Sequence, residues 1–154
     1  MVYKEISYSF EMRDYIISAS VVTFNNEREI EGVLSCLNES SISDMLDIYV
    51  IDNSSYDKTV DIVKGKYKNV ILIKNERNLG YGGGHNVAIE KIESKYHFII
   101  NPDIAFNKDL LCEIIDFLDN NEDVVLCIPR ILDKEKKLKY PPKKNPRIRY
   151  LFGR

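Results

Sequence analysis

The sequence predicts an α/β fold in which a mostly parallel sheet is covered by helices on both faces, giving three layers. Two observations lead to this prediction: short apolar segments recur along the chain, and segments with helical periodicity separate them. Strands that are apolar throughout are typical of parallel sheets, because both faces of such a sheet are buried. The helices between them supply the crossovers that parallel pairing needs. A length of 154 residues fits one such domain.

The first expected strand covers 16–24 (IISASVVTF), which is rich in β-branched residues. A helix over about 26–39 follows, because its apolar residues recur at the spacing of one helix face. These residues are Ile30, Val33, Leu34 and Leu37. The second strand covers 48–51 (IYVI). The next helix starts near Asp57, which can cap it. Its apolar face carries Val60, Val63 and Tyr67.

The third expected strand covers 70–73 (VILI), and a helix over about 84–94 follows it. That helix should direct three apolar residues inward, namely Ala88, Ile89 and Ile92. The fourth strand covers 97–100 (HFII). A further helix is marked by Leu110, Leu111, Ile114, Ile115 and Leu118. The fifth strand covers 124–128 (VVLCI), so the predicted order alternates strand and helix throughout.

The two ends of the chain differ from this pattern. Apolar and polar residues alternate over 5–12, which predicts an extra N-terminal strand. From residue 132 onward lysines and arginines crowd around prolines, and no regular core element is expected there. We therefore divide the chain into a domain over 1–131 and a basic, proline-containing tail over 132–154.

Composition excludes several classes of protein. The formal net charge is −2 and the isoelectric point is near 5.8, which disfavours nucleic-acid binding through global charge. The cysteines form no CxxC pair, and they are expected to be reduced thiols. The N-terminus lacks a signal-peptide pattern, and the longest apolar run is about half a membrane span. We therefore expect a cytoplasmic protein.

Polar residues follow four consecutive predicted strands. The carboxyl ends of parallel strands lie at one edge of the sheet, where open α/β folds bind their ligands. The segments at these ends are 23–27, 52–55, 75–84 and 101–103. Asn and Asp at such places are often only turn formers or helix caps. Their occurrence at four strand ends together favours a binding site for a polar small molecule.

Three features of this edge allow more than one interpretation. The run Gly80–Gly84 is either a flexible linker or a place where a phosphate or sugar approaches backbone N–H groups. It matches neither the dinucleotide fingerprint nor the P-loop. His85 is either a phosphate donor or a helix cap. Asp103, stiffened by Pro102, is either a ligand for Mg²⁺ or Mn²⁺ or a solvent-facing turn residue.

Four motifs at these positions resemble those of the family 2 glycosyltransferases, which have the GT-A fold. They are SVVTFN (20–25), IDNSS (51–55), NLGYGGGHN (78–86) and NPD (101–103). The resemblance covers about residues 16–142 and is strongest to the rhamnosyltransferase-like branch. Each motif is weak alone, but together and in this order they are specific. They imply a GT-A domain that binds a nucleotide-diphosphate sugar.

The resemblance also implies roles for individual residues. Asp52 would bind the base, uracil or thymine, and 80–86 would pass near the ribose, the diphosphate and the sugar. Asn101 to Asp103 stand where the family places an Asp-x-Asp motif, so Asp103 would hold the divalent cation, Mg²⁺ or Mn²⁺. The full implied binding set is Thr23, Phe24, Asn25, Glu27, Asp52, Asn53, Asn78, Gly80, Gly84, His85, Asn86, Asn101 and Asp103.

The implied activity is inverting transfer of a sugar, of the hexosyltransferase type, from a UDP- or dTDP-sugar to a glycan or lipid-linked acceptor. The implied setting is bacterial cell-surface polysaccharide synthesis. The family's general base lies in an acceptor-binding part expected beyond Arg154, and no residue here is assigned to that role. The alternatives are a non-catalytic module that binds the donor for a partner chain, or a truncated transferase.

Two further partner expectations concern the surface. The tail over 134–154 either touches anionic lipid at the inner face of the membrane or is an ordinary solvated segment. We also expect that the chain can form a homo-oligomer. No nucleic-acid partner is expected.

Overall fold

The structure is a computed structural model that describes residues 16–132, 135 and 137. It divides into two units, Met1–Ile115 and Asp116–Arg154, and the boundary falls within helix α4 (Leu110–Asp119). The strand predicted over 5–12 lies outside the described residues, as does nearly all of the tail predicted over 132–154. The domain boundary predicted at 131 stays a prediction.

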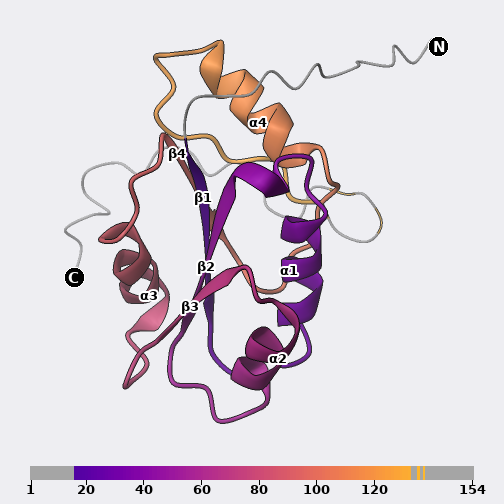
Figure 1. The fold of residues 1–154 in the computed structure, drawn as a ribbon. Coiled ribbons are helices and arrows are strands. Elements are labelled where there is room, and N and C mark those ends of the chain that lie inside the picture. The colour runs from indigo at the N-terminus through magenta and orange to yellow at the C-terminus, as the bar shows by residue number, and fades with distance from the viewer. Residues whose placement is uncertain (1–15, 133–134, 136, 138–154) are drawn as a thin grey trace. The chain divides into compact units, whose positions relative to one another are not determined.

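The first unit contains a sheet of four parallel strands (Figure 1). They are β1 (Ile17–Thr23), β2 (Leu46–Asp52), β3 (Val70–Lys74) and β4 (Tyr96–Ile100). Their spatial order is β3-β2-β1-β4, so β1 lies between β2 and β4. The register pairs Thr23 with Asp52 and Val21 with Ile100, which brings the carboxyl ends of these three strands together. The predicted parallel α/β sheet is confirmed.

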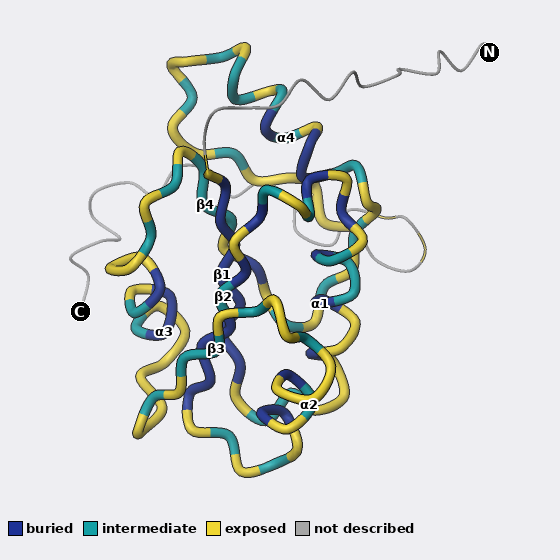
Figure 2. Tube along the Cα trace, in the orientation of Figure 1, coloured by how far each residue is buried: buried dark blue, intermediate teal, exposed yellow. Residues whose placement is uncertain are grey.

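Helices cover both faces of this sheet, as predicted. Helices α1 (Ile30–Asn38) and α2 (Thr59–Lys66) lie on one face, and α3 (Gly80–Ile89) lies on the other (Figure 1). Alternate side chains of β1 serve the two faces: Ile17, Ala19 and Val21 join the core beneath α1, whereas Val22 packs with Ala88 of α3. Figure 2 shows that burial is concentrated in the strands and in the inward helix faces.

Helix α3 differs from the prediction in both of its ends. It begins at Gly80 rather than near residue 84, and it ends at Ile89. Ile89 was expected to point inward but is 47% exposed, while Gly84 and His85 are buried. Glycine is a poor helix former, so propensity argues against this start. Close packing of the helix on β1 outweighs propensity, because only small residues on the inward face let the backbones approach.

The strand predicted over 124–128 is not formed, and that prediction is wrong. In the described part of the second unit these residues lie outside regular structure, and Val125 is 97% exposed. A strand exists only when its backbone pairs with a neighbouring strand. An apolar run records a tendency to be buried, but it does not specify the partner that would bury it.

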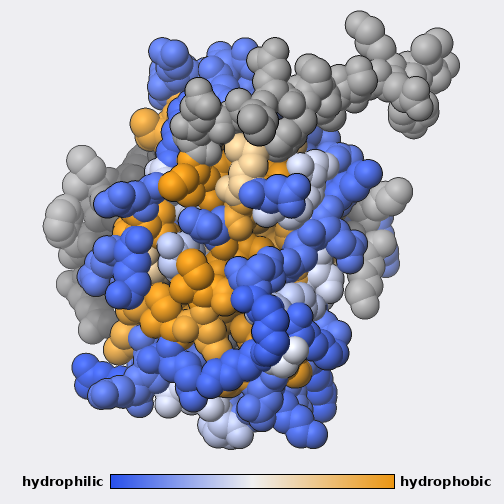
Figure 3. All heavy atoms as spheres, in the orientation of Figure 1, coloured by the Kyte–Doolittle hydropathy of each residue, from blue (hydrophilic) through white to orange (hydrophobic). Residues whose placement is uncertain are grey.

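At one edge of the sheet, β3 has only β2 as a neighbour among the described strands. Its side chains are intermediate or exposed, and Ile71 is 43% exposed. Figure 3 shows apolar side chains gathered in the middle of this face of the molecule, where β3 forms the near edge of the sheet.

Candidate functional site

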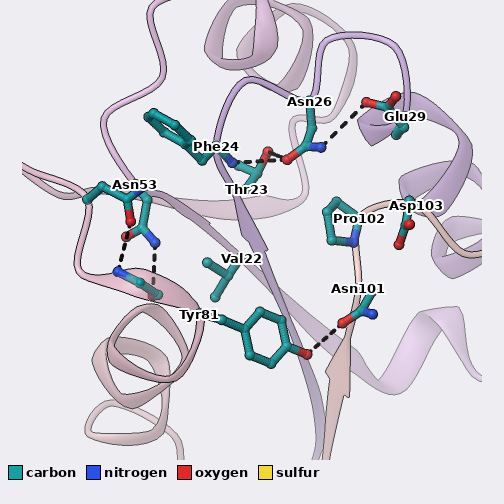
Figure 4. Close-up of a pocket in the computed structure, with 12 residues that line it drawn as sticks. Val22, Thr23, Phe24, Asn26, Glu29, Asn53, Tyr81, Asn101, Pro102 and Asp103 are labelled. Atoms are coloured by element: carbon teal, nitrogen blue, oxygen red, sulfur yellow. Dashed lines mark hydrogen bonds between the residues drawn. The ribbon is translucent and has the colours of Figure 1, made fainter.

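A pocket of about 490 Å³ opens at the carboxyl ends of β1 and β4 (Figure 4). The chain reverses its direction of strand addition here, because β2 and β3 lie on one side of β1 and β4 lies on the other. Such a reversal is the usual binding position in an open α/β sheet. The pocket is lined by Val22, Thr23, Phe24, Asn26, Glu29, Asn53, Asn78, Gly80, Tyr81, Asn101, Pro102 and Asp103.

The lining includes seven of the thirteen residues in the predicted binding set. They are Thr23, Phe24, Asn53, Asn78, Gly80, Asn101 and Asp103. The other five lining residues are absent from the predicted binding set: Val22, Asn26, Glu29, Tyr81 and Pro102. Tyr81 had a signal, because it is the one large side chain inside the glycine run. Glu29 had none, since it lies six residues beyond the end of β1.

Asn25, a predicted binding residue, belongs to the frame of the site and does not line the pocket. Its backbone N–H donates to Ser55 Oγ at 2.9 Å, and its Oδ1 accepts from the Tyr56 N–H at 3.0 Å. Its φ of 56° lies in the left-handed region, which Asn tolerates better than most residues. The loop after β1 is thereby joined to the loop after β2.

Glu27 reinforces the same connection. Its carboxylate accepts from the Lys58 N–H at 3.1 Å, and its own N–H donates to Asp57 Oδ2 at 3.0 Å. Asp57 also accepts from the N–H of Thr59, the first residue of α2, at 2.9 Å, so it serves the start of that helix as predicted. Burial raises the pKa of Asp57, but its hydrogen bonds from Thr59 and Glu27 more than offset this and hold the pKa below its usual value.

Asp52 is fully buried and lies outside the pocket lining. Both of its carboxylate oxygens accept from the Ser55 N–H at 3.2 Å, which closes the turn after β2. Ser54 in this turn has a φ of 69°. A left-handed serine costs about 1 kcal/mol or more unless the surroundings hold it, and such residues cluster at binding sites.

Asn53 both lines the pocket and anchors helix α3. Its side-chain amide donates to the Gly80 carbonyl at 3.0 Å, and its Oδ1 accepts from Asn75 Nδ2 at 2.9 Å. Gly80 starts the helix with a φ of 74°, a conformation that glycine adopts without strain. Because of this anchor, the glycine run forms the first half of α3. It is therefore not a flexible linker.

Three predicted residues of α3 lie outside the lining: Gly84, His85 and Asn86. Gly84 is pressed against β1, so a Cβ placed on it would lie 2.6 Å from Val22 Cγ1. His85 is buried, and its Nδ1 lies 2.8 Å from Ser20 Oγ. Asn86 is exposed. Gly84 and His85 therefore support the site from behind, and none of the three lines the pocket.

Tyr81 connects α3 to the end of β4 across the pocket. Its hydroxyl donates to Asn101 Oδ1 at 2.6 Å, as Figure 4 shows. Burial, followed by the nearby charge of Asp103, raises the pKa of Tyr81, so the hydroxyl keeps its proton at neutral pH. The phenol is therefore a hydrogen-bond donor at this wall of the pocket.

The charge of the lining is one-sided. Glu29 and Asp103 supply two carboxylates, and no lining residue is Lys or Arg. Within the described residues no group of three His, Cys, Asp or Glu side chains is placed to hold a metal ion. Any cation at Asp103 would therefore take most of its ligands from water or from a bound molecule.

Fold and site together define the class of protein. A parallel α/β sheet with a polar pocket at the ends of β1 and β4 is the arrangement of the GT-A glycosyltransferases, and the structure matches solved members of that class. The model of the family described as Glycosyl transferase family 2 matches residues 18–154, and the chain belongs to this family.

Individual relatives agree with this assignment. The chain is 33% identical over 121 residues to the uncharacterized glycosyltransferase MJ1057 of Methanocaldococcus jannaschii, covering 75% of this chain and 41% of that protein. It is 27% identical to the abequosyltransferase RfbV of Salmonella typhimurium over 117 residues, 73% of this chain and 35% of that one. The chain thus spans well under half of the length of these relatives.

Solved structures show the same fold. Residues 1–349 of TarS from S. aureus superpose with a TM-score of 0.64 at 27% identity, over 70% of this chain and 33% of that one. The mannosyltransferase PcManGT of Pyrobaculum calidifontis, solved with GDP-Man and Mn²⁺, gives the same TM-score at 21% identity, over 70% of this chain and 33% of that chain. Among the described residues, no helix has both the length and the apolar character needed to cross a membrane.

Proposed function

We propose that this chain binds a nucleotide-diphosphate sugar and forms the donor-binding part of a glycosyltransferase. The observation that carries the proposal is the pocket at the ends of β1 and β4, into which four separate strand ends contribute residues. TarS, at 27% identity, was solved in complex with UDP-GlcNAc, which supports a uridine nucleotide as donor. We favour UDP- or dTDP-sugars for that reason and because of the motif resemblance.

An aromatic side chain at the mouth of the pocket suits the nucleobase. Phe24 lines the pocket and is 42% exposed. Tyr56 contacts it edge-on, with ring centroids 6.1 Å apart, and this holds one side of the ring. The exposed part of Phe24 offers a stacking surface, and stacking of a base on an aromatic ring contributes about 1–3 kcal/mol.

The diphosphate requires positive charge that the lining does not supply. Two carboxylates and no cationic side chain face the pocket, so a bound diphosphate would meet net repulsion. Asp103 would hold a divalent cation, which would supply the positive charge that the diphosphate needs. Mg²⁺ and Mn²⁺ suit such a site, because they accept oxygen ligands and retain waters while binding phosphates. Asp103 is exposed and therefore accessible to the ion.

The proposed reaction is transfer of the sugar with inversion. An acceptor hydroxyl attacks the anomeric carbon, the bond to the nucleoside diphosphate breaks, and the bonding electrons leave with the diphosphate. A divalent cation, when bound, neutralises the leaving group. The residues of this chain hold the donor, and the Asn101 amide and the Tyr81 hydroxyl stand at the wall beside Asp103. The general base that takes the acceptor proton is assigned to no residue here.

The biological setting proposed is the synthesis of a cell-surface polysaccharide, with a glycan or lipid-linked acceptor. The names of two relatives support it: the abequosyltransferase RfbV, and the amylovoran biosynthesis glycosyltransferase AmsB of Erwinia amylovora, which is 26% identical. A cytoplasmic location and contact of the basic tail with anionic lipid belong to the same proposal. The second candidate function is that of a donor-binding module without turnover. An assay of donor hydrolysis or sugar transfer distinguishes it from the first.

The test is calorimetric titration of the chain with UDP, dTDP and GDP, each with Mn²⁺ and with EDTA. We expect uridine or thymidine nucleotides to bind in the presence of Mn²⁺ and EDTA to weaken that binding. Asp103→Asn should remove the effect of Mn²⁺, whereas Asp47→Asn, an exposed aspartate near the start of β2, should not. Absence of binding to any nucleotide would refute the proposed function.

The nucleobase contact has its own variant. Phe24→Ala should weaken nucleotide binding by roughly tenfold, in keeping with loss of a stacking contact. Phe117→Ala, which removes an aromatic residue of similar exposure from α4, is the matched control. Equal affinities of the two variants would exclude Phe24 from the base site and leave the other contacts standing.

A further inference from the structure

A chain of polar side chains, three of them buried (Ser18, Ser20 and His85) and two half-buried (Ser94 and His97), lies between the sheet and helix α3, where apolar packing would be expected. Ser18 and Ser20 of β1 point to this face, together with His97 of β4 and His85 of α3. Ser18 Oγ lies 2.8 Å from His97 Nδ1, and Ser20 Oγ lies 2.8 Å from both His97 Nε2 and His85 Nδ1. Ser94 Oγ, 2.7 Å from Ser18 Oγ, completes the chain.

Counting the hydrogen-bond donors and acceptors limits where the hydrogens in this network can lie. The Ser20 hydroxyl has one hydrogen but faces two ring nitrogens, so at least one of those nitrogens must donate to it. With both imidazoles neutral, the hydrogen bonds can run from Ser94 towards His85, or in the reverse direction. Every contact is satisfied in either direction. The network can therefore be fully satisfied with both histidines neutral.

The second nitrogen of the His85 ring, Nε2, is not paired by the network. His85 is 3% exposed, and its Nε2 is buried without a hydrogen-bond partner among the described residues. Burial, followed by the neighbouring His97, lowers the pKa of His85 to about 4. A buried polar network with an unpaired atom costs stability relative to apolar packing. Its presence therefore calls for a role beyond filling the core.

The network ends against the pocket. The His85 ring meets the Tyr81 ring edge-on, with centroids 4.5 Å apart and planes at 74°. Tyr81 lies one helical turn before His85 on α3, and its hydroxyl donates to Asn101 in the pocket wall. Tyr81 is 52% exposed, so few protein atoms contact the solvent-facing side of its ring. Its aromatic contact among the described residues is with His85.

We propose that His85 is a positioning residue, which is held by Ser20 and in turn holds the Tyr81 ring so that its hydroxyl donates to Asn101. Two features make His85 suited to this. Its Nδ1 is fixed at 2.8 Å from a strand residue, which sets the plane of the ring. Its position one turn after Tyr81 places the two side chains on the same helix face.

The consequence for ligand binding rests on the proposed function. Tyr81 and Asn101 line the wall beside Asp103, where the diphosphate and sugar of the donor are proposed to lie. The Tyr81 hydroxyl already donates to Asn101 Oδ1, which fixes the orientation of the Asn101 amide. Asn101 Nδ2 can then donate a hydrogen bond to an oxygen of the bound nucleotide-sugar. Loss of His85 would release this pair and weaken donor binding without removing any residue that lines the pocket.

The first experiment needs no ligand. Tyrosine labelled at the ring carbon that bears the hydroxyl gives an NMR signal sensitive to hydrogen bonding, and Tyr81→Phe identifies the Tyr81 signal. We expect His85→Phe and Ser20→Ala to shift this signal. Ser94→Ala, a matched serine at the far end of the network, should leave it in place.

The second experiment uses calorimetry with UDP and Mn²⁺. Loss of the positioning contact should weaken binding by about fivefold to tenfold. If His85 acts through Tyr81, the double variant His85→Phe/Tyr81→Phe should bind no more weakly than Tyr81→Phe alone. Additive losses would overturn the inference, as would an unmoved Tyr81 signal in both His85→Phe and Ser20→Ala. If the unaltered chain binds no nucleotide, the proposed function fails, and the NMR experiment still decides the role of His85.

Discussion

Gly84 offers a sharp test of how helix α3 is held against the sheet. In Gly84→Ala the new Cβ would lie 2.6 Å from Val22 Cγ1, 2.8 Å from Val22 Cγ2 and 3.3 Å from Asn53 Nδ2. Carbon atoms in contact normally stay 3.5–4.0 Å apart, so the helix or Val22 must move by about 1 Å. The shift would also press on the amide that anchors the Gly80 carbonyl.

The magnitude follows from two opposed effects. Alanine stabilises a helix by up to about 1 kcal/mol relative to glycine. Overpacking of a close contact costs about 1–3 kcal/mol. Gly82→Ala on the same helix isolates the first effect, because a Cβ there meets nothing within 4 Å. The difference between the two variants should therefore be about 1–3 kcal/mol, with Gly84→Ala the less stable.

Urea unfolding measures this difference directly. The chain has no Trp and 10 Tyr, so tyrosine fluorescence and far-UV circular dichroism are the appropriate signals. We expect the midpoint to fall for Gly84→Ala and to stay or rise for Gly82→Ala, with an unchanged slope. Adding Val22→Ala to Gly84→Ala should cost less than Val22→Ala does alone, because the methyl groups that clash are gone. Equal midpoints for the two glycine variants would refute the close packing of α3 on β1.

Three further predictions concern His85, Asp57 and Ser54. The pKa of His85 falls from 6.5 to about 4 on folding, so the unfolded state binds more protons between these pH values. The free energy of unfolding should therefore decrease by up to about 3 kcal/mol as the pH falls from 6.5 to 4. His85→Phe should flatten this part of the stability–pH curve, and a curve unchanged by the substitution would contradict the prediction. Asp57→Ala should lower the free energy of unfolding by about 1 kcal/mol, because it removes the acceptor at the start of α2; thermal unfolding beside Asp61→Ala on the exposed side of that helix is the check. Ser54→Gly should raise stability by up to about 1 kcal/mol, since its φ of 69° suits glycine; a lower melting temperature would show that the turn imposes no strain.

The order of strands and helices was predictable because periodicity is a local property. Strands β1 to β4 agree with the prediction to within about two residues at each end. The concentration of Asn and Asp after successive strands also predicted the edge at which the pocket lies. Parallel strands place all their carboxyl ends on one side, so this conclusion needed no knowledge of side-chain contacts.

The contacts within the site were harder to predict from the sequence. Asn25, Glu27 and Asp52 are residue types typical of binding sites, yet their polar atoms are engaged within the frame of the site. Asn25 and Glu27 join the loops after β1 and β2, and Asp52 closes the turn after β2. Most of these partners are about thirty positions apart in sequence, which no local pattern can reveal. Tyr81 and Glu29 face the pocket only because α3 starts at Gly80 and the loop after β1 folds back towards Asp103.

The amino-acid order alone thus established the alternating architecture, the parallel sheet and the polar edge, since each arises from residues that are neighbours in sequence. Tertiary packing decided which polar groups line the pocket, which only brace its loops, and that 124–128 forms no strand. The physical reason is that a side chain's direction and a strand's pairing depend on partners distant in sequence, whereas periodicity and turn chemistry depend on the nearest residues.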